Sequence, residues 1–187
     1  MRIGILGSSF NPPHEGHLKL SKEAIDIFEL DQIWWLITKK NPLKNEFDYM
    51  NFFKRKSKIE SMIDKQSILL KYFEEESKSN FLIDNLQYIK KTFPKNEYIF
   101  LMGSDSFIEI NKWKSYEDIF NETYLAVFNR NSSKESVNSS KAGIEYERFK
   151  LEEPSKNIFN NELPCWTFIS DFNIKISSSD MRKNIEL

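Results

Sequence analysis

Residues 2–17 read RIGILGSSFNPPHEGH, and this stretch holds both histidines of the chain, His14 and His17. The apolar run that opens the stretch ends at Gly7, and a short apolar run before a glycine is typical of a buried strand. The Pro-Pro pair then predicts a stiff turn, and helical spacing of apolar residues begins near His17. The stretch therefore predicts a strand, a loop and a helix in succession, the first βα unit of a parallel sheet.

The rest of the sequence repeats this alternation of strand and helix patterns. Apolar runs predict strands at residues 2–7, 32–38, 67–73, 97–103, 124–130, 166–170 and 174–176. Helical spacing or capping patterns predict helices at residues 17–29, 51–63, 82–93, 104–111, 116–120 and 177–185. This order predicts an α/β fold, a Rossmann-like open parallel sheet with helices on both faces, in a single domain over residues 1–187. The polar, serine-rich segment at about residues 131–143 is expected to be a flexible loop.

The composition restricts the classes of function. The net charge is −1 and no basic stripe is present, which argues against a nucleic-acid-binding or membrane-surface protein. Cys165 is the single cysteine, so an internal disulfide and a cysteine-rich metal site are excluded, and its apolar surroundings predict a small buried residue. No apolar run approaches the length that crosses a bilayer, and the start MRIGILG lacks a signal-peptide pattern. We therefore expect a cytoplasmic protein.

The loop between the first strand and the first helix has the composition of a phosphate site. Gly7 allows a close approach of the backbone to a ligand, and a helix that begins near Glu15 directs N–H groups and its positive dipole end toward an anion. His14 and His17 share a face of that first turn. The residues alone leave open a helix-cap or surface role for each histidine, and also a metal site, although a third histidine is lacking. Neither the GxxxxGK[ST] nor the GxGxxG phosphate pattern is present.

A second motif lies near the end of the chain. Residues 176–182 read ISSSDMR, which on its own is typical of a helix N-cap. Together with HEGH at residues 14–17, it resembles the paired HxGH and ISSxxxR motifs of the nucleotidyltransferase α/β-phosphodiesterase superfamily. Within that superfamily the chain looks most like the bacterial nicotinate-nucleotide adenylyltransferases. The segments that carry this likeness are GSSFNPPHEGH (7–17), WWLITKKNPLK (34–44), IFLMGSDSFIEINKW (99–113) and PCWTFIS with ISSSDMR (164–170 and 176–182).

The resemblance implies a reaction. Enzymes of that family transfer the adenylyl group of ATP to nicotinate mononucleotide, which gives nicotinate adenine dinucleotide (deamido-NAD) and pyrophosphate in NAD biosynthesis. The phosphate of the mononucleotide attacks the α-phosphorus of ATP directly, so no enzyme nucleophile is needed. Mg²⁺ would accompany ATP, bound mainly through the phosphates and not by a metal site of the protein. A homo-oligomer is compatible with the resemblance.

The resemblance also implies site residues. The catalytic residues would be His14, His17 and Arg182. The ATP-binding residues would be Gly7, Ser8, Ser9, Phe10, His14, Gly16, His17, Gly103, Ser177, Ser178, Ser179 and Arg182. The nicotinate-mononucleotide-binding residues would be Lys44, Phe81, Leu82, Asp105 and Trp113.

Departures from the family pattern keep alternatives open. Ser8 replaces the second glycine of the first loop, and the segment NFLIDN (80–85) retains Asp84 but lacks the threonines that help to grip nicotinate in the family. The Pro-Gly pair expected after Arg130 is also missing. The alternatives are a sister transferase with another phosphate acceptor, such as nicotinamide mononucleotide or phosphopantetheine, and a catalytically inactive nucleotide-binding module.

Overall fold

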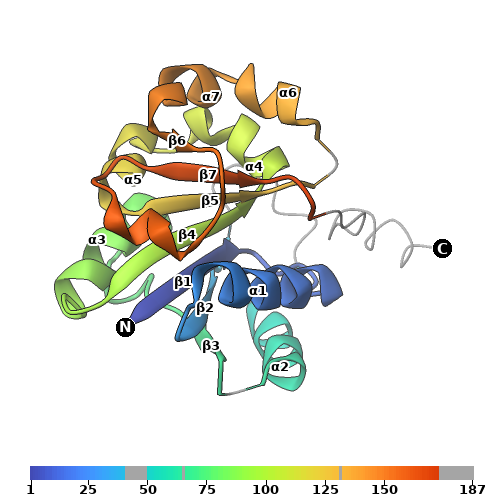
Figure 1. Cartoon of the computed structure of the whole chain (residues 1–187). Helices are drawn as coiled ribbons and strands as arrows, with labels where there is room; N and C mark the ends of the chain where they lie inside the picture. The colour runs from blue at the N-terminus through green and yellow to red at the C-terminus, as the bar shows by residue number, and fades with distance from the viewer. Residues whose placement is uncertain (41–49, 65, 131, 173–187) are drawn as a thin grey trace.

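A computed structural model describes residues 1–40, 50–64, 66–130 and 132–172 of the chain (Figure 1). Seven strands form one sheet in the order β3-β2-β1-β4-β5-β7-β6, and every neighbouring pair is parallel. The strands are β1 (Arg2–Ser8), β2 (Gln32–Ile37), β3 (Ile68–Lys71), β4 (Glu97–Gly103), β5 (Tyr124–Phe128), β6 (Lys150–Leu151) and β7 (Trp166–Ile169). The predicted α/β class and parallel sheet are confirmed.

Helices connect the strands. The α-helices are α1 (Glu15–Phe28), α2 (Phe52–Met62), α3 (Leu82–Thr92), α4 (Ser104–Ile108), α5 (Tyr116–Glu122), α6 (Lys134–Asn138) and α7 (Lys141–Glu145). Short 3₁₀ turns are η2 (Ile110–Lys112), η3 (Glu147–Phe149) and η4 (Lys156–Asn160). The predicted helix at 104–111 is thus divided into α4 and η2, because the chain leaves the α-helical path at Glu109.

The sheet separates two apolar cores. Successive residues of a strand point to opposite faces, so Trp34 belongs to the core beneath α3, α4, α5, α6 and α7, whereas Trp35 belongs to the core beneath α1, α2 and η4. Figure 1 shows α6 and α7 together at the end of the sheet where β6 and β7 lie, far from β3. The predicted helices on both faces are therefore present.

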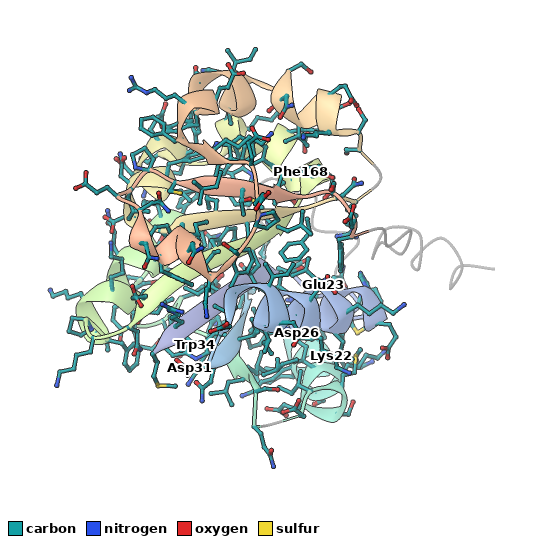
Figure 2. All side chains as sticks on the ribbon, in the orientation of Figure 1. Lys22, Glu23, Asp26, Asp31, Trp34 and Phe168 are labelled. Atoms are coloured by element: carbon teal, nitrogen blue, oxygen red, sulfur yellow. The ribbon has the colours of Figure 1, made fainter. Side chains whose placement is uncertain are left out.

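Helix α1 is amphipathic because its apolar residues recur at helical spacing. Leu20, Ala24 and Phe28 are buried against the sheet. Charged residues such as Lys22 and Glu23 are exposed on the outer side of the helix (Figure 2). The burial of this one face fixes the first turn of α1 over the end of β1.

The described residues 132–143 contain α6 and the start of α7, where the composition predicts a loop. Ser133 Oγ accepts a hydrogen bond from the Ser136 N–H and caps α6, and Ser140 Oγ accepts from the Gly143 N–H and caps α7. Val137 is buried on this segment. The serines are N-caps of two short helices, so the loop expectation is wrong over the described residues 132–143. The strand expected at 174–176 and the helix expected at 177–185 lie outside the described residues.

The order of the strands creates a topological switch point between β1 and β4. Strand β1 pairs with β2 on one side and with β4 on the other, so the connections leave β1 and β4 in opposite directions. In open parallel sheets, ligands bind beyond the carboxyl ends of the strands at such a switch point. The loop that carries the histidines begins there.

Candidate functional site

The two histidines cap the N-terminus of α1. His14 precedes the helix, and its Nδ1 accepts a hydrogen bond from the Gly16 N–H at 3.1 Å. Nδ1 of His17 in turn accepts a hydrogen bond from the His14 N–H at 3.2 Å. This is the reciprocal pattern of a capping box, built from two imidazoles. The helix-cap role that the sequence left open is therefore present, and it uses the Nδ1 atoms alone.

The cap bonds decide which ring nitrogen carries the proton. An Nδ1 that accepts a hydrogen bond bears no hydrogen, so each neutral ring is protonated at Nε2 and donates from there. Burial, and then the charge of Arg130, lower the pKa of His14 from 6.5 to about 4. Burial, and then the charges of His14 and Arg130, lower the pKa of His17 well below 6.5. Both rings are therefore neutral donors at pH 7.

One of these donors lacks an acceptor. Nε2 of His14 is buried and has no hydrogen-bond partner among the described residues. A buried polar atom without a partner is rare in folded proteins and calls for an explanation, such as an absent ligand. The position of His14 at a helix N-terminus favours an anionic ligand.

Aromatic side chains support the histidine rings. The centroids of the His14 and His17 rings lie 3.9 Å apart. The fully buried Phe10 ring lies 4.8 Å from the His17 ring and stacks on Trp35 at 4.7 Å. Trp35 Nε1–H donates to Ser21 Oγ of α1 at 2.8 Å. The side chain of Phe10, which the family resemblance assigns to ATP binding, is therefore part of the support beneath His17 and is not exposed to a ligand.

Two cavities meet at the carboxyl ends of β1 and β4. The histidine cavity has a volume of about 70 Å³, and its walls include Gly7, Ser8, His14, Gly16, His17, Gly103 and Arg130. The apolar cavity has a volume of about 150 Å³, and its walls include Gly7, Ser8, Ser9, Phe81, Leu82 and Trp113. Trp113 also lines the histidine cavity. The two cavities thus share Gly7, Ser8 and Trp113.

The junction of the cavities depends on a residue without a side chain. A Cβ atom at Gly7 would lie 2.9 Å from Cε2 of Phe100, a distance that real Cβ atoms essentially never show. The close approach of the β1 end to the Phe100 ring therefore requires glycine. The sequence-based expectation concerned the approach of a ligand to Gly7 and stays a prediction; the neighbour that the structure shows is an aromatic ring.

Arg130 is a candidate site residue that the sequence patterns did not identify. It follows β5, and the Ser104 Oγ accepts from its N–H at 2.8 Å and donates to its carbonyl oxygen at 3.0 Å. These bonds fix Arg130 beside the start of α4, where it lines the histidine cavity. An arginine directly after a strand at the binding edge of a parallel sheet is the signal that could have found it.

The structure brings most of the predicted site residues together. Those in the walls of one or both cavities are Gly7, Ser8, Ser9, His14, Gly16, His17, Phe81, Leu82, Gly103 and Trp113. Asp105 is exposed in the first turn of α4 and is not among the residues that line either cavity. Lys44, Ser177, Ser178, Ser179 and Arg182 lie outside the described residues.

Other side chains hold the segment in which the threonines of the family are missing. Asn85 Nδ2 donates to the carbonyl oxygens of Ser79 at 3.0 Å and of Phe81 at 2.8 Å. Ser79 Oγ donates to Asp84 Oδ2 at 2.5 Å, and the same carboxylate pairs with Lys114 Nζ at 2.8 Å. These bonds fix the chain at the start of α3, beside the apolar cavity.

The described residues contain no group of three His, Cys, Asp or Glu side chains that could hold a metal ion. The metal-site interpretation of the two histidines therefore gains no further ligand from this part of the chain. Cys165 is buried as predicted, and burial raises the pKa of its thiol to about 11. No helix in the described ranges is long and apolar enough to cross a membrane.

Residues 5–184 match the model of the cytidylyltransferase-like family. The chain belongs to this family. A relative from Pelagibacter ubique, named probable nicotinate-nucleotide adenylyltransferase, is 38% identical over 97% of this chain and 92% of its own length. A relative of the same name from Ruegeria sp. is 29% identical over 98% of this chain and 97% of its own length. The likeness to nicotinate-nucleotide adenylyltransferases, first drawn from short motifs, thus extends over nearly the whole chain.

Solved structures show the same fold. Plasmodium falciparum nicotinic acid mononucleotide adenylyltransferase, complexed with NaAD, superposes with a TM-score of 0.71 at 23% identity and covers 97% of this chain and 82% of its own. The same enzyme complexed with APC gives a TM-score of 0.70 at 22% identity, with the same coverage. At these identities the likeness establishes the shared fold.

Proposed function

We propose that this protein is an ATP-dependent nicotinate-nucleotide adenylyltransferase. It transfers the adenylyl group of ATP to nicotinate mononucleotide and releases pyrophosphate. The observation that carries the proposal is the buried and unpartnered His14 Nε2 at the switch point of the sheet. The chain belongs to the cytidylyltransferase-like family, and relatives that align over almost their full length are named for this activity.

The histidine cavity would hold the reacting phosphates. In a direct transfer, negative charge is spread over the oxygens of the α-phosphate and grows on the leaving pyrophosphate. Nε2–H of His17 and of His14 would donate to these oxygens, and Arg130, which lines the same cavity, would add a positive charge. Because the capping bonds and the aromatic support fix both rings in advance, little reorganisation is needed during the reaction. Gly7, Gly16 and Gly103 would let the backbone approach the nucleotide, and Ser8 would line the same cavity.

A divalent cation would come with the triphosphate and would neutralise part of its charge. The described residues offer no protein cage for the ion, which suits Mg²⁺ held mainly through phosphate oxygens and water. Ser177, Ser178, Ser179 and Arg182 would hold the β- and γ-phosphates, as the motif resemblance implies.

The apolar cavity would hold the acceptor. Its walls carry Phe81, Leu82 and the half-buried Trp113, and a flat pyridine ring fits a site with aromatic walls. Because the two cavities share Gly7 and Ser8, an acceptor phosphate at their junction would face the α-phosphate of ATP. Lys44 would contact phosphate and Asp105 would lie at the acceptor side; both assignments stay predictions. A cytoplasmic location and a homo-oligomer also stay predictions.

The proposal is tested by incubating the purified protein with ATP, Mg²⁺ and nicotinate mononucleotide. We expect nicotinate adenine dinucleotide and pyrophosphate in equal amounts. His17→Ala should reduce kcat by at least about 100-fold, since the loss of one such transition-state donor typically costs that much. Lys22→Ala, an exposed change on the same helix (Figure 2), is the matched control and should retain full activity. ATP binding without transfer by the wild-type protein would favour an inactive nucleotide-binding module.

A further inference from the structure

Helix α2 contains a buried arginine that none of the motifs includes. Arg55 is 1% exposed. Its Nη1 donates to the carbonyl oxygen of Ser9 and to that of Thr38, the latter at 2.8 Å. Its Nη2 donates to the carbonyl oxygen of Lys39 at 2.7 Å, and its Nε donates to that of Met50 at 3.0 Å. These carbonyls belong to three separate segments: the loop after β1, the loop after β2 and the residues before α2. A guanidinium suits this task because its donors have fixed directions in one plane.

The carbonyl of Ser9 lies at a strained point of the histidine loop. The next residue, Phe10, has φ of 45°, a left-handed conformation that is uncommon for a bulky side chain. Such conformations persist where contacts with the surrounding structure hold the residue in place. The peptide unit between these residues is held at both ends, because Ser9 O accepts from Arg55 and the Phe10 N–H donates to Ser8 Oγ at 3.1 Å.

The same arginine reaches the other side of the site. Thr38, whose carbonyl it binds, lines the apolar cavity, and the Thr38 N–H donates to Ser8 O at 3.3 Å. A second tie runs in parallel, because the Met50 N–H donates to Asn11 Oδ1 at 2.9 Å. Arg55 therefore joins the loop that presents the histidines to the loop that borders the apolar cavity.

We infer that Arg55 is a positioning residue for adenylyl transfer. It holds the two loops in one relative position, so that the acceptor phosphate and the α-phosphate of ATP meet in line. The inference rests on the proposed function, and it concerns alignment, since Arg55 contacts backbone carbonyls on both sides. A misplacement of about 1 Å in such a site can reduce the rate about 100-fold. The effect should fall mainly on kcat, because each substrate retains its own cavity.

The test compares two substitutions of Arg55 with a control on the same helix. Arg55→Lys keeps the charge but cannot span the carbonyls of three segments, and Arg55→Ala removes the group and leaves space for a small cation. Ile59→Ala, one turn further along α2, removes a fully buried aliphatic side chain. It should lower the Tm without removing a polar contact to either loop. kcat, both KM values and Tm are measured well below the lowest Tm.

We expect kcat to fall about 100-fold in both Arg55 variants, with KM changed less than about fivefold. Ile59→Ala should keep kcat within about threefold of wild type despite its lower Tm. Millimolar guanidinium should raise the kcat of Arg55→Ala at least about tenfold. Methylammonium should not, because only the planar guanidinium ion reproduces the directions of the arginine donors. If Arg55→Ala does not fold, Arg55→Lys alone decides.

Wild-type kcat in Arg55→Lys would overturn the inference. So would an equal loss in Ile59→Ala without rescue of Arg55→Ala by guanidinium, because Arg55 would then act through stability alone. If the wild-type protein transfers adenylyl groups to no acceptor, the proposed function fails separately. Arg55 is then judged by hydrogen exchange of the Phe10 and Thr38 backbone amides in the two loops, which should speed up at least about tenfold more in Arg55→Lys than in Ile59→Ala.

Discussion

The buried cap of α1 should make the protein sensitive to acid, and His14→Asn should remove the part of that sensitivity that His14 contributes. The folded protein lowers the pKa of His14 from 6.5 to about 4. Between these values the unfolded chain binds a proton at His14 and the folded protein does not. The free energy of unfolding therefore rises with pH across this window. The contribution of the neutral His14 is fully present above about pH 6.5 and is lost as the pH falls toward 4.

The magnitude follows from the two pKa values. A change from 6.5 to about 4, at about 1.4 kcal/mol for each pH unit, corresponds to about 3 kcal/mol below pH 4 and about 2 kcal/mol at pH 5. His14 is only 5% exposed, so solvent screening reduces this little. Asparagine is also a preferred N-cap residue and can accept the Gly16 N–H in place of the imidazole, so the variant should fold.

The assay is urea unfolding of the wild-type protein and of His14→Asn at pH 7.5, 6 and 5. From pH 7.5 to pH 5 the wild type should lose about 2 kcal/mol more than the variant. Carboxylates that titrate in both proteins cancel in this difference. Lys22→Ala, which leaves the cap intact, should follow the wild type. A constant difference between wild type and His14→Asn at all three pH values would refute the reasoning.

Three further predictions concern the hydrogen bond of Ser21 to Trp35, the Trp113 side chain and the Cys165 thiol. Ser21→Ala should lower the free energy of unfolding by about 1–3 kcal/mol in urea, because it leaves the buried Nε1–H of Trp35 without its acceptor; a variant as stable as wild type would contradict this. Trp113→Ala should raise the KM for the acceptor at least about tenfold, with a smaller change in the KM for ATP, whereas equal changes would contradict the assignment of the indole to the acceptor. Cys165 should react with a thiol reagent at pH 8 far more slowly in the native protein than in urea, because burial raises its pKa to about 11; equal rates would show that the thiol is exposed.

The sequence predicted the sheet well because its strands are short, continuous apolar runs. The bounds of β4 match the expected residues 97–103, since all of its residues after Glu97 are buried and the run ends at a glycine. The segment at 131–143 was predicted wrongly because α6 and α7 have five residues each, too few to show a helical period. Its serines act as N-caps, yet in composition they are indistinguishable from loop residues.

The sequence could point to the candidate site where its residues lie in one continuous motif. His14 and His17 were singled out from that motif, but the capping role of their Nδ1 atoms, which leaves Nε2 as the donor, needed coordinates. Phe10 belongs to the same motif, although its ring is buried beneath His17. Arg55 could not be found in this way, because its partner Ser9 is 46 positions away in the sequence and supplies only a carbonyl oxygen. Contacts to the backbone leave no side-chain pattern to recognise.

The central claim is the transfer of an adenylyl group to nicotinate mononucleotide. The most direct measurement is the rate of pyrophosphate release from ATP and Mg²⁺ with nicotinate mononucleotide, nicotinamide mononucleotide or phosphopantetheine as the acceptor. We expect nicotinate mononucleotide to give the highest kcat/KM, by at least about tenfold over each of the others. That result would show that the segment held by Ser79, Asp84 and Asn85 recognises the acceptor without the threonines of the family. An equal or higher kcat/KM with another acceptor, or no release with any of them, would contradict the claim.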